Sequence, residues 1–296
     1  MRKFYVLTDT TASVEKKYRE ELDFDYLPML FTLENKTYDA DLDWKEIGPT
    51  DYYNKMRAGN RITTGLIKAT EVERKVEEAF KKGLDVLYVA CSSKLSGSVK
   101  NASLLAEEVL KKYPERRLVC LDTLRSCYAQ GLMAIDAAKM ANEGASIDEC
   151  VAKLEEAKLN YQVYATVGTL EWLRLAGRVK ASKAFFGNLM GVKPIVVSDA
   201  NGNNYGFKKT KGRLNSLNEL VDICCTRVFN PEEATIFVEH ADSLKDAEYV
   251  AAKIKERINP KCINISDLGP IVGSTTGPDT ICVSFYGEKV EIVSGE

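Results

Sequence analysis

Short apolar runs alternate with amphipathic helical patterns along most of this chain. One run covers residues 86–90, and the helical pattern that follows places Val99, Ala102 and Val109 on one face. Strands that alternate with helices are typical of α/β proteins with a parallel sheet. We therefore expect an α/β fold. The strands expected are 4–7, 26–31, 86–90, 118–121, 163–167, 193–197, 235–239, 262–265 and 281–285.

The length of 296 residues is sufficient for two domains. We place the boundary near residue 160. Residues 1–160 then form an N-terminal α/β domain with a mainly parallel sheet flanked by helices, and residues 161–296 form a C-terminal α/β domain. Because no Pro-rich or low-complexity linker separates the halves, we expect them to pack together with a ligand between them.

Charge and composition exclude several classes of function. The 41 basic and 43 acidic residues give a net charge of −2, so no basic excess is present for binding nucleic acid. The N-terminal apolar run is too short for a secretory signal, and no apolar stretch has the length of a membrane span. The eight cysteines lack a Cys-x-x-Cys pair and His240 is the only histidine. We therefore expect a cytoplasmic protein with reduced thiols and no bound metal.

A serine-rich turn is the strongest candidate for a binding site. Residues 92–98 read Ser-Ser-Lys-Leu-Ser-Gly-Ser and lie between the expected strand 86–90 and a helix. Such a turn directs backbone N–H groups and hydroxyls to one point, where the helix dipole adds positive potential. It suits a small anion, either a carboxylate or a phosphate. The simpler interpretation is that Ser96 or Ser98 only caps the helix, and the residues alone leave both open.

Four further segments have the composition of functional loops. Residues 9–13 form a second hydroxyl-rich turn, which is also explained as a helix cap. Residues 63–65 and 173–178 bring two threonines and Arg178. Residues 269–278 contain three glycines and two prolines, which predicts a loop whose backbone passes close to a ligand. The chain has neither a Walker loop nor a Gly-x-Gly-x-x-Gly motif, so we expect no nucleotide cofactor.

Taken in order, these segments resemble the DegV family of bacterial fatty-acid-binding proteins, nearly from end to end. The resemblance is carried by six motifs. They lie at Asp9-Thr10-Thr11-Ala12, at Ser92 to Ser98, at Asp122-Thr123 through Gly131, at Leu170 through Arg178, at Lys193-Pro194-Ile195 and at Leu268 through Asp279.

The resemblance implies a two-domain fold in which one long-chain fatty acid is buried between the domains. It implies a lipid-binding protein rather than an enzyme, whose partner is a separate fatty acid kinase that phosphorylates the bound carboxylate. The carboxylate would be held by Thr64 or its neighbour Thr63, by Ser93 and by Arg178. The full set of candidate ligand-binding residues is Thr63, Thr64, Ser93, Ser96, Gly97, Arg178, Thr275 and Thr276.

The chain departs from the family pattern at three places. Gly65-Leu66-Ile67 follows Thr64 where the family has Ser-Gln-Pro, and Ala176 replaces a glycine. In the closing motif Thr275 replaces a histidine and Asp279 a glycine. Because the family histidine belongs to the polar network around the carboxylate, its loss bears mainly on the coupling to a kinase.

Further expectations concern the acyl chain and its release. Phe185, Phe186, Leu189 and Met190 are candidates for the tunnel wall, although their spacing also fits a buried helix face. Residues 171–175 mix apolar and basic side chains, which suggests a gate that contacts a membrane transiently. The alternative function is an acyl- or phosphoryl-transfer enzyme with Ser93 or Ser96 as nucleophile and Asp9, Asp122 or His240 as base. A third interpretation is a pure interaction or regulatory module.

Overall fold

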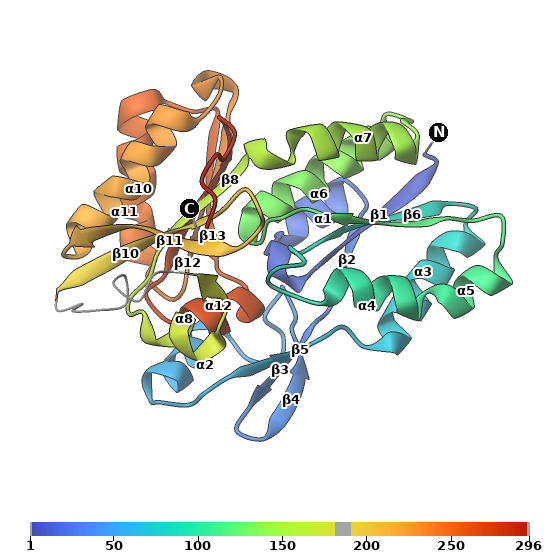
Figure 1. Cartoon of the computed structure of the whole chain (residues 1–296), viewed down its shortest axis with the longest axis horizontal. Coiled ribbons are helices and arrows are strands. Elements are labelled where there is room, and N and C mark those ends of the chain that lie inside the picture. Colours follow the sequence, from blue (N-terminus) through green and yellow to red (C-terminus); the bar gives the residue numbers. More distant parts are fainter. Residues whose placement is uncertain (1, 181–190, 295–296) are drawn as a thin grey trace.

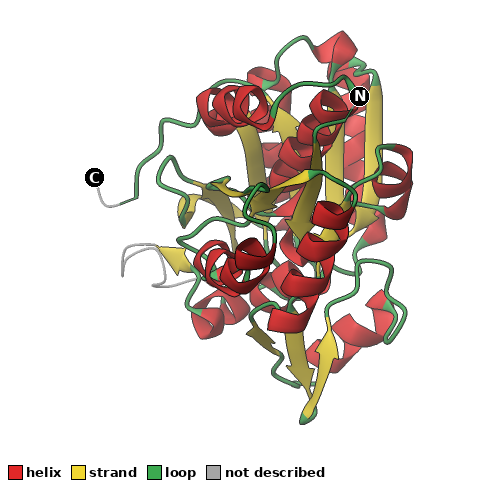
Figure 2. Cartoon of the chain, turned by 90° about the vertical axis from the view of Figure 1, so that its right-hand side faces the viewer, coloured by secondary structure: helices red, strands yellow, loops and turns green. Residues whose placement is uncertain are grey.

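The computed structural model describes residues 2–180 and 191–294. Strands and helices alternate through it, so the expected α/β fold is confirmed. Within the described residues the strands form three sheets, of four, seven and three strands. Figure 1 shows the two larger sheets side by side with the small third sheet below them, and Figure 2 shows helices packed around the sheets.

The four-stranded sheet is parallel throughout, in the order β2-β1-β6-β7. Nearly all residues of β1 and β6 are buried, because helices cover both faces of the sheet. The strands are β1 (Phe4–Asp9), β2 (Asp25–Leu27), β6 (Asp85–Ala90) and β7 (Leu118–Asp122). The surrounding elements are η1 (Thr10–Ala12), α1 (Lys16–Glu21), α3 (Ala69–Lys81), α4 (Ser98–Leu105), α5 (Glu107–Lys112), α6 (Cys127–Asn142), α7 (Ile147–Ala157) and η2 (Lys158–Asn160).

The seven-stranded sheet is mixed, in the order β13-β12-β14-β8-β10-β11-β9. Its strands are β8 (Tyr161–Thr166), β9 (Val179–Lys180), β10 (Val192–Ser198), β11 (Asn204–Lys211), β12 (Thr235–His240), β13 (Cys262–Asp267) and β14 (Ile281–Tyr286). Its other elements are α8 (Glu171–Ala176), α10 (Arg213–Arg227), η3 (Pro231–Glu233), α11 (Leu244–Ile258) and α12 (Pro270–Thr276). Helices α10 and α11 pack against this sheet, while α6 contacts both larger sheets. Helix α6 is accordingly buried almost all round.

The small sheet holds two candidate threonines next to a helix from the second half of the chain. It consists of β3 (Leu30–Leu33), β4 (Lys36–Asp39) and β5 (Thr63–Gly65), all antiparallel. Helix α12 packs against β3, β5 and α2 (Pro49–Arg57). The small sheet therefore places Thr63 and Thr64 beside α12.

The prediction of a single strand over residues 26–31 is wrong. The segment is divided into β2 and β3, which belong to different sheets. Pro28 lies at the break, and a proline cannot donate a hydrogen bond within a sheet. The backbone N–H of Met29 donates instead to Thr10 Oγ1 over 3.1 Å.

The prediction of a loop over residues 269–278 is also wrong, because most of this segment forms helix α12. Pro270 occupies the first helical position, and Gly277 ends the helix with φ 81°. A proline at the start and a glycine after the end are boundary signals of a helix. Here they mark a short helix of seven residues.

The two halves of the chain make close polar contacts. The hydroxyls of Tyr52 and Tyr53 donate to the carbonyls of Pro270 over 2.7 Å and Leu268 over 2.6 Å. The backbone N–H of Tyr128, in the first turn of α6, donates to Glu239 Oε2 over 3.0 Å. The division at residue 160 stays a proposal, since the larger buried apolar cluster includes side chains from both sides of it.

No helix within residues 2–180 and 191–294 is both long enough and apolar enough to span a membrane.

Candidate ligand-binding site

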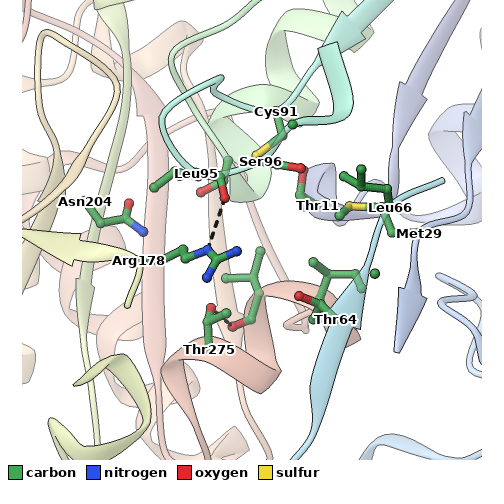
Figure 3. Close-up of a pocket in the computed structure, with 15 residues that line it drawn as sticks. Thr11, Met29, Thr64, Leu66, Cys91, Leu95, Ser96, Arg178, Asn204 and Thr275 are labelled. Atoms are coloured by element: carbon green, nitrogen blue, oxygen red, sulfur yellow. Dashed lines mark hydrogen bonds between the residues drawn. The ribbon is translucent and has the colours of Figure 1, made fainter. Parts of the chain in front are cut away.

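A pocket lies where the carboxyl ends of β1 and β6 meet α12. Ligands of open α/β sheets commonly bind outside the carboxyl ends of the strands. The pocket has a volume of about 180 Å³ and is drawn in Figure 3. We call it the main pocket. Its lining residues are Thr11, Met29, Thr64, Gly65, Leu66, Cys91, Leu95, Ser96, Gly97, Ser126, Arg178, Asn204, Ile271, Val272 and Thr275.

The serine-rich turn contributes Ser96 to the main pocket and not Ser93. Ser93 is exposed, and its backbone N–H donates to Asp122 Oδ1 over 3.1 Å. Ser96 Oγ accepts from the backbone N–H of Ser98 at the start of α4 and lies 2.8 Å from Ser98 Oγ. Ser96 thus satisfies an orphan N–H of the helix while its side chain lines the pocket. The structure therefore does not bring Ser93 to the pocket.

The four candidate threonines lie at different places. Thr64 and Thr275 line the main pocket, and both also line a second cavity next to it. Thr63 lines only that second cavity. The hydroxyls of Thr275 and Thr276 donate within α12 to the carbonyl of Val272, over 2.7 and 3.1 Å. In this conformation each offers lone pairs, rather than its proton, to other groups.

We call the second cavity the arginine pocket. It also has a volume of about 180 Å³, and it shares Thr64, Arg178 and Thr275 with the main pocket. Its lining residues are Arg61, Ile62, Thr63, Thr64, Trp172, Leu175, Ala176, Arg178, Ser274 and Thr275.

Arg178 is an unpaired cation at the junction of these two cavities. Its Nε donates to the carbonyl of Leu95 over 3.4 Å, the dashed line in Figure 3, and its Nη1 donates to the carbonyl of Ala176 over 2.7 Å. In the part of the chain that the structure describes, no carboxylate forms an ion pair with it. Its charge is therefore available to a bound anion.

A buried polar network supports the floor of the main pocket. The Asp9 carboxylate accepts from the backbone N–H of Thr11 over 2.9 Å, from the Tyr88 hydroxyl over 2.6 Å and from the backbone N–H of Cys91 over 3.1 Å. Thr11 in turn donates to Gln130 Oε1 over 2.6 Å. These bonds connect the turns that follow β1 and β6 to each other.

Several lining residues were not expected from the sequence, among them Thr11, Ser126 and Asn204. Thr11 belonged to a turn explained as a helix cap, and Asp9 does accept the backbone N–H of Thr11 as the cap of η1. Thr11 and Ser126 follow the ends of β1 and β7, and this position was the signal that could have found them, whereas Asn204 begins β11, a strand that the sequence did not predict.

A third, apolar pocket continues from the main pocket between the seven-stranded sheet and α12. It shares Ser126, Asn204 and Val272 with the main pocket, and its volume is about 30 Å³. Its lining residues are Ser126, Cys127, Val163, Ala165, Val167, Leu173, Val196, Val197, Ser198, Asn204, Val272, Thr276 and Cys282. The expected wall residues Phe185, Phe186, Leu189 and Met190 lie outside the described residues.

Among the described residues, the hydroxyls of Ser93 and Ser96, the candidate nucleophiles, form no hydrogen bond with Asp9, Asp122 or His240. Burial raises the pKa of the Cys91 thiol well above its usual value, so it stays protonated. Ser96 Oγ is bonded to Ser98, whereas the ring of His240 lies 3.6 Å from Asp267 and lines none of the three cavities. Within residues 2–180 and 191–294, no cluster of three or more His, Cys, Asp or Glu side chains could hold a metal ion.

Two comparisons of the sequence with known proteins point to the same family. The model of the DegV family, described as uncharacterised proteins, matches residues 3–288. A DegV domain-containing protein of Clostridium perfringens is 36% identical over 98% of this chain and 100% of its own length.

Solved structures that share the fold of this chain are also those of DegV proteins. A DegV family protein from Thermus thermophilus, described as binding fatty acid, has a TM-score of 0.86 and 25% identity, covering 97% of this chain and 100% of its own. A DegV lipid-binding protein from Thermotoga maritima shows the same fold, with a TM-score of 0.84 and 23% identity over 98% of this chain and 100% of its own. On the family match and the Clostridium relative, this chain belongs to the DegV family.

Proposed function

We propose that this protein is a non-catalytic carrier that binds one long-chain fatty acid and presents it to a partner protein. Arg178 is the observation that carries the proposal, because it lines the main pocket as a cation with no carboxylate partner among the described residues. The description of the Thermus relative as fatty-acid-binding supports the class of ligand.

The carboxylate would lie in the main pocket. Arg178 supplies the compensating charge, and Ser96 and Thr64 supply neutral hydroxyls. Gly97 adds the N-terminal end of α4, whose dipole favours an anion. Thr275 completes the wall, and rotation of its hydroxyl about the Cβ–Oγ1 bond, away from the carbonyl of Val272, would direct its proton to the ligand. A buried carboxylate without such partners would be strongly penalised.

The acyl chain would extend into the apolar pocket. About fifteen methylenes leaving water supply roughly 12 kcal/mol before the costs of association and ordering. At about 30 Å³ the apolar pocket is too narrow for such a chain as it stands, so neighbouring side chains must move. Helix α8 is the element that we propose to move, since Leu173 lines the apolar pocket while Trp172 and Leu175 line the arginine pocket.

The partner and the place of action are part of the same proposal. A fatty acid kinase is the proposed partner, and transient contact of α8 with a membrane is the proposed route of exchange. A cytoplasmic location is supported by the cysteines, all eight of which are free thiols. Presentation to a kinase is tested by adding a bacterial fatty acid kinase and ATP to the loaded protein. Acyl phosphate is expected, and its absence would remove the kinase from the proposal.

The binding proposal is tested by mass spectrometry of an organic extract of the purified, never-delipidated protein. We expect a fatty acid in near-stoichiometric amount. Arg178→Gln should lose most of it, whereas Arg117→Gln, an exposed position just before β7 that lines none of the three cavities, should retain it. A wild-type extract without fatty acid, even after incubation with added fatty acids, would overturn the proposal.

A further inference from the structure

Two cysteine thiols from different halves of the chain line the apolar pocket. Cys127 is the first residue of α6, and Cys282 belongs to β14. Both residues are buried, with exposed fractions of 4% and 1%, and both carry free thiols. Cys91 is also buried, but it lines the main pocket instead. The wall of the apolar pocket therefore contains one thiol from each half of the chain.

The pairing of β12 with β14 brings these two thiols together. Cys282 lies opposite Glu239 in this antiparallel pair, so the two side chains lie on the same face of the sheet. Glu239 Oε2 accepts the backbone N–H of Tyr128, the residue next to Cys127, over 3.0 Å. A hydrogen bond with the Cys282 thiol, together with burial, raises the pKa of Cys127 well above its usual value. The two sulfur atoms are therefore direct neighbours.

Packing alone does not explain a cysteine at position 127. Its φ is 56°, in the left-handed region that glycine, asparagine and aspartate adopt more readily than other residues. A buried cysteine often serves as a small apolar side chain, but that role does not require a strained backbone. Residues held in such conformations are concentrated at functional positions. Ser126 Oγ lies 3.7 Å from the Cys127 sulfur, so this thiol has a polar neighbour besides Cys282.

We propose that Cys127 and Cys282 are a modification site, at which a peroxide joins the two halves of the protein through a disulfide. The peroxide oxidises one thiolate to a sulfenic acid and leaves as water, or as an alcohol where the peroxide is organic. The second thiol then attacks this sulfur, so that the S–S bond forms and a water departs. Two thiols are oxidised and one peroxide is reduced.

Glu239 supplies the acceptor for the thiol proton. Its carboxyl lies beside Cys282 in the strand pair and reaches the first turn of α6. Because the raised pKa of Cys127 keeps that thiol protonated, oxidation requires a nearby base that removes the proton. The carboxylate of Glu239 takes it up and returns it to the departing water.

The disulfide would restrict the opening of the apolar pocket. A covalent S–S bond holds β14 against the start of α6, and both sulfur atoms stay in the pocket wall. An acyl chain buried there leaves only when neighbouring side chains move apart, so oxidation should slow its release. The effect on release rests on the proposed function, whereas the disulfide follows from the two neighbouring thiols alone.

The disulfide is tested on a protein with Cys262→Ser, which removes the exposed thiol and leaves one cysteine in each of the tryptic peptides 126–139 and 262–289. Hydrogen peroxide and linoleate hydroperoxide are added in separate arms. Free thiols are then alkylated, and mass spectrometry identifies the peptides without reduction. We expect these two peptides to be joined. Cys282→Ala should abolish the joined pair, whereas Cys150→Ala, a buried position that lines none of the three cavities, should retain it.

The two arms distinguish the sources of the peroxide. A joined pair with linoleate hydroperoxide alone supports the site and assigns the oxidant to the acyl chain. A joined pair with hydrogen peroxide supports the site with a small diffusing oxidant. The proposal is overturned if neither peroxide joins the peptides, or if Cys127 is joined to Cys91 instead.

The release of a fluorescent fatty acid from oxidised and reduced protein is the second readout. Oxidation should slow the release several-fold, and dithiothreitol should restore it. Cys282→Ala should release the ligand at one rate before and after the peroxide. An unchanged rate in fully joined protein would overturn the effect on release. A protein that forms the disulfide but binds no fatty acid would contradict the proposed function and support the modification site.

Discussion

At the scale of single residues, position in a turn decides which serine can reach a ligand. Ser93 and Ser96 lie three residues apart in one motif, yet Ser93 is exposed and Ser96 lines the main pocket. The motif predicts an anion-binding turn, but the direction of each side chain depends on the turn's hydrogen bonds. Ser96 is held by the N–H of Ser98, and the backbone of Ser93 is held by Asp122.

Ser96→Ala is expected to weaken binding of a long-chain fatty acid by about tenfold or more, because a hydrogen bond to a charged group contributes about 1.5–3 kcal/mol. Ser93→Ala is the matched control and should bind as the wild type does. Isothermal titration with both variants decides the matter, together with urea unfolding to correct for the lost cap of α4. Equal affinities in all three proteins would remove Ser96 from the site.

Glu239 is a buried carboxyl group at the contact between the two halves. Its side chain is fully buried, and burial raises its pKa from 4.5 to about 7 despite the hydrogen bond from the Tyr128 N–H. The folded protein therefore holds a proton there that the unfolded chain releases at lower pH. It follows that stability falls as the pH rises from about 4.5 to about 7.

The expected loss between about pH 5 and pH 8 is on the order of 3 kcal/mol, since one pKa unit corresponds to about 1.4 kcal/mol. Glu239→Gln retains an acceptor for Tyr128 and removes the titration. Urea unfolding of both proteins across this pH range should show the wild type declining relative to the variant. A difference between them that does not change with pH would mean that Glu239 does not titrate in this window.

At the scale of elements, α12 is positioned by two glycines that face aromatic rings. A Cβ on Gly273 would lie 2.2 Å from Tyr53 Oη, and one on Gly277 would lie 2.0 Å from the Trp172 ring. Tyr53 cannot yield easily, because it is fully buried and bonded to the carbonyl of Leu268. The close packing of α12 against α2 and α8 sets the position of Thr275 in the pocket wall.

Gly273→Ala should therefore lower the free energy of unfolding by about 1–3 kcal/mol, as overpacking of a buried contact does. Gly48→Ala is the control, because no atom lies within 4 Å of its added Cβ. Its cost should be a few tenths of a kcal/mol. Combining Gly273→Ala with Tyr53→Phe removes the clashing oxygen and should recover part of the loss. Additive losses in denaturant unfolding would argue against this contact.

The sequence predicted elements well where burial alone determines them. The run 86–90 is apolar on both faces, and it forms β6, one of the two inner strands of the parallel sheet, within one residue of the expected bounds. The prediction failed at 26–31 and 269–278, where Pro28 divides a run and Pro270 begins a helix. Proline has opposite effects at these two positions, and only the surrounding packing distinguishes them.

The candidate site was predictable in outline. The motif resemblance assigned the carboxylate to Thr64, Ser93 and Arg178, and the wider candidate set added Ser96 and Thr275. The structure brings four of these five to one pocket and leaves Ser93 outside it. Asn204 and Arg61 carry no local pattern, because their role arises only when distant segments pack together. The arginine pocket depends on the end of α8, a feature of the folded chain.

At the scale of the whole molecule, Arg57 links the two halves near the site. It pairs with Asp242 and, over 2.8 Å, with Asp279 Oδ1. Asp279 has φ 63°, a conformation that aspartate adopts more readily than most residues. Its ion pair with Arg57 joins α2 to the segment before β14.

Arg57→Gln should increase the dissociation rate of a bound fatty acid several-fold, because the halves separate more easily, while stability falls by less than about 1 kcal/mol for so exposed a pair. Arg74→Gln, whose partners Glu71 and Glu78 lie on its own helix, is the control and should leave the rate unchanged. Stopped-flow fluorescence of the release of a fluorescent fatty acid gives the dissociation rate of each variant. The two rates should converge at high salt, where the ion pairs are screened.

The tyrosine contacts between the halves have a consequence for comparing relatives. Tyr52 and Tyr53 donate to main-chain carbonyls, which every amino acid possesses. A change at position 268 or 270 therefore leaves the acceptor in place and requires no compensating change at position 52 or 53. Correlated substitution between these positions should be weak, although they are in direct contact. Methods that infer proximity from co-varying positions would miss one of the main contacts between the halves.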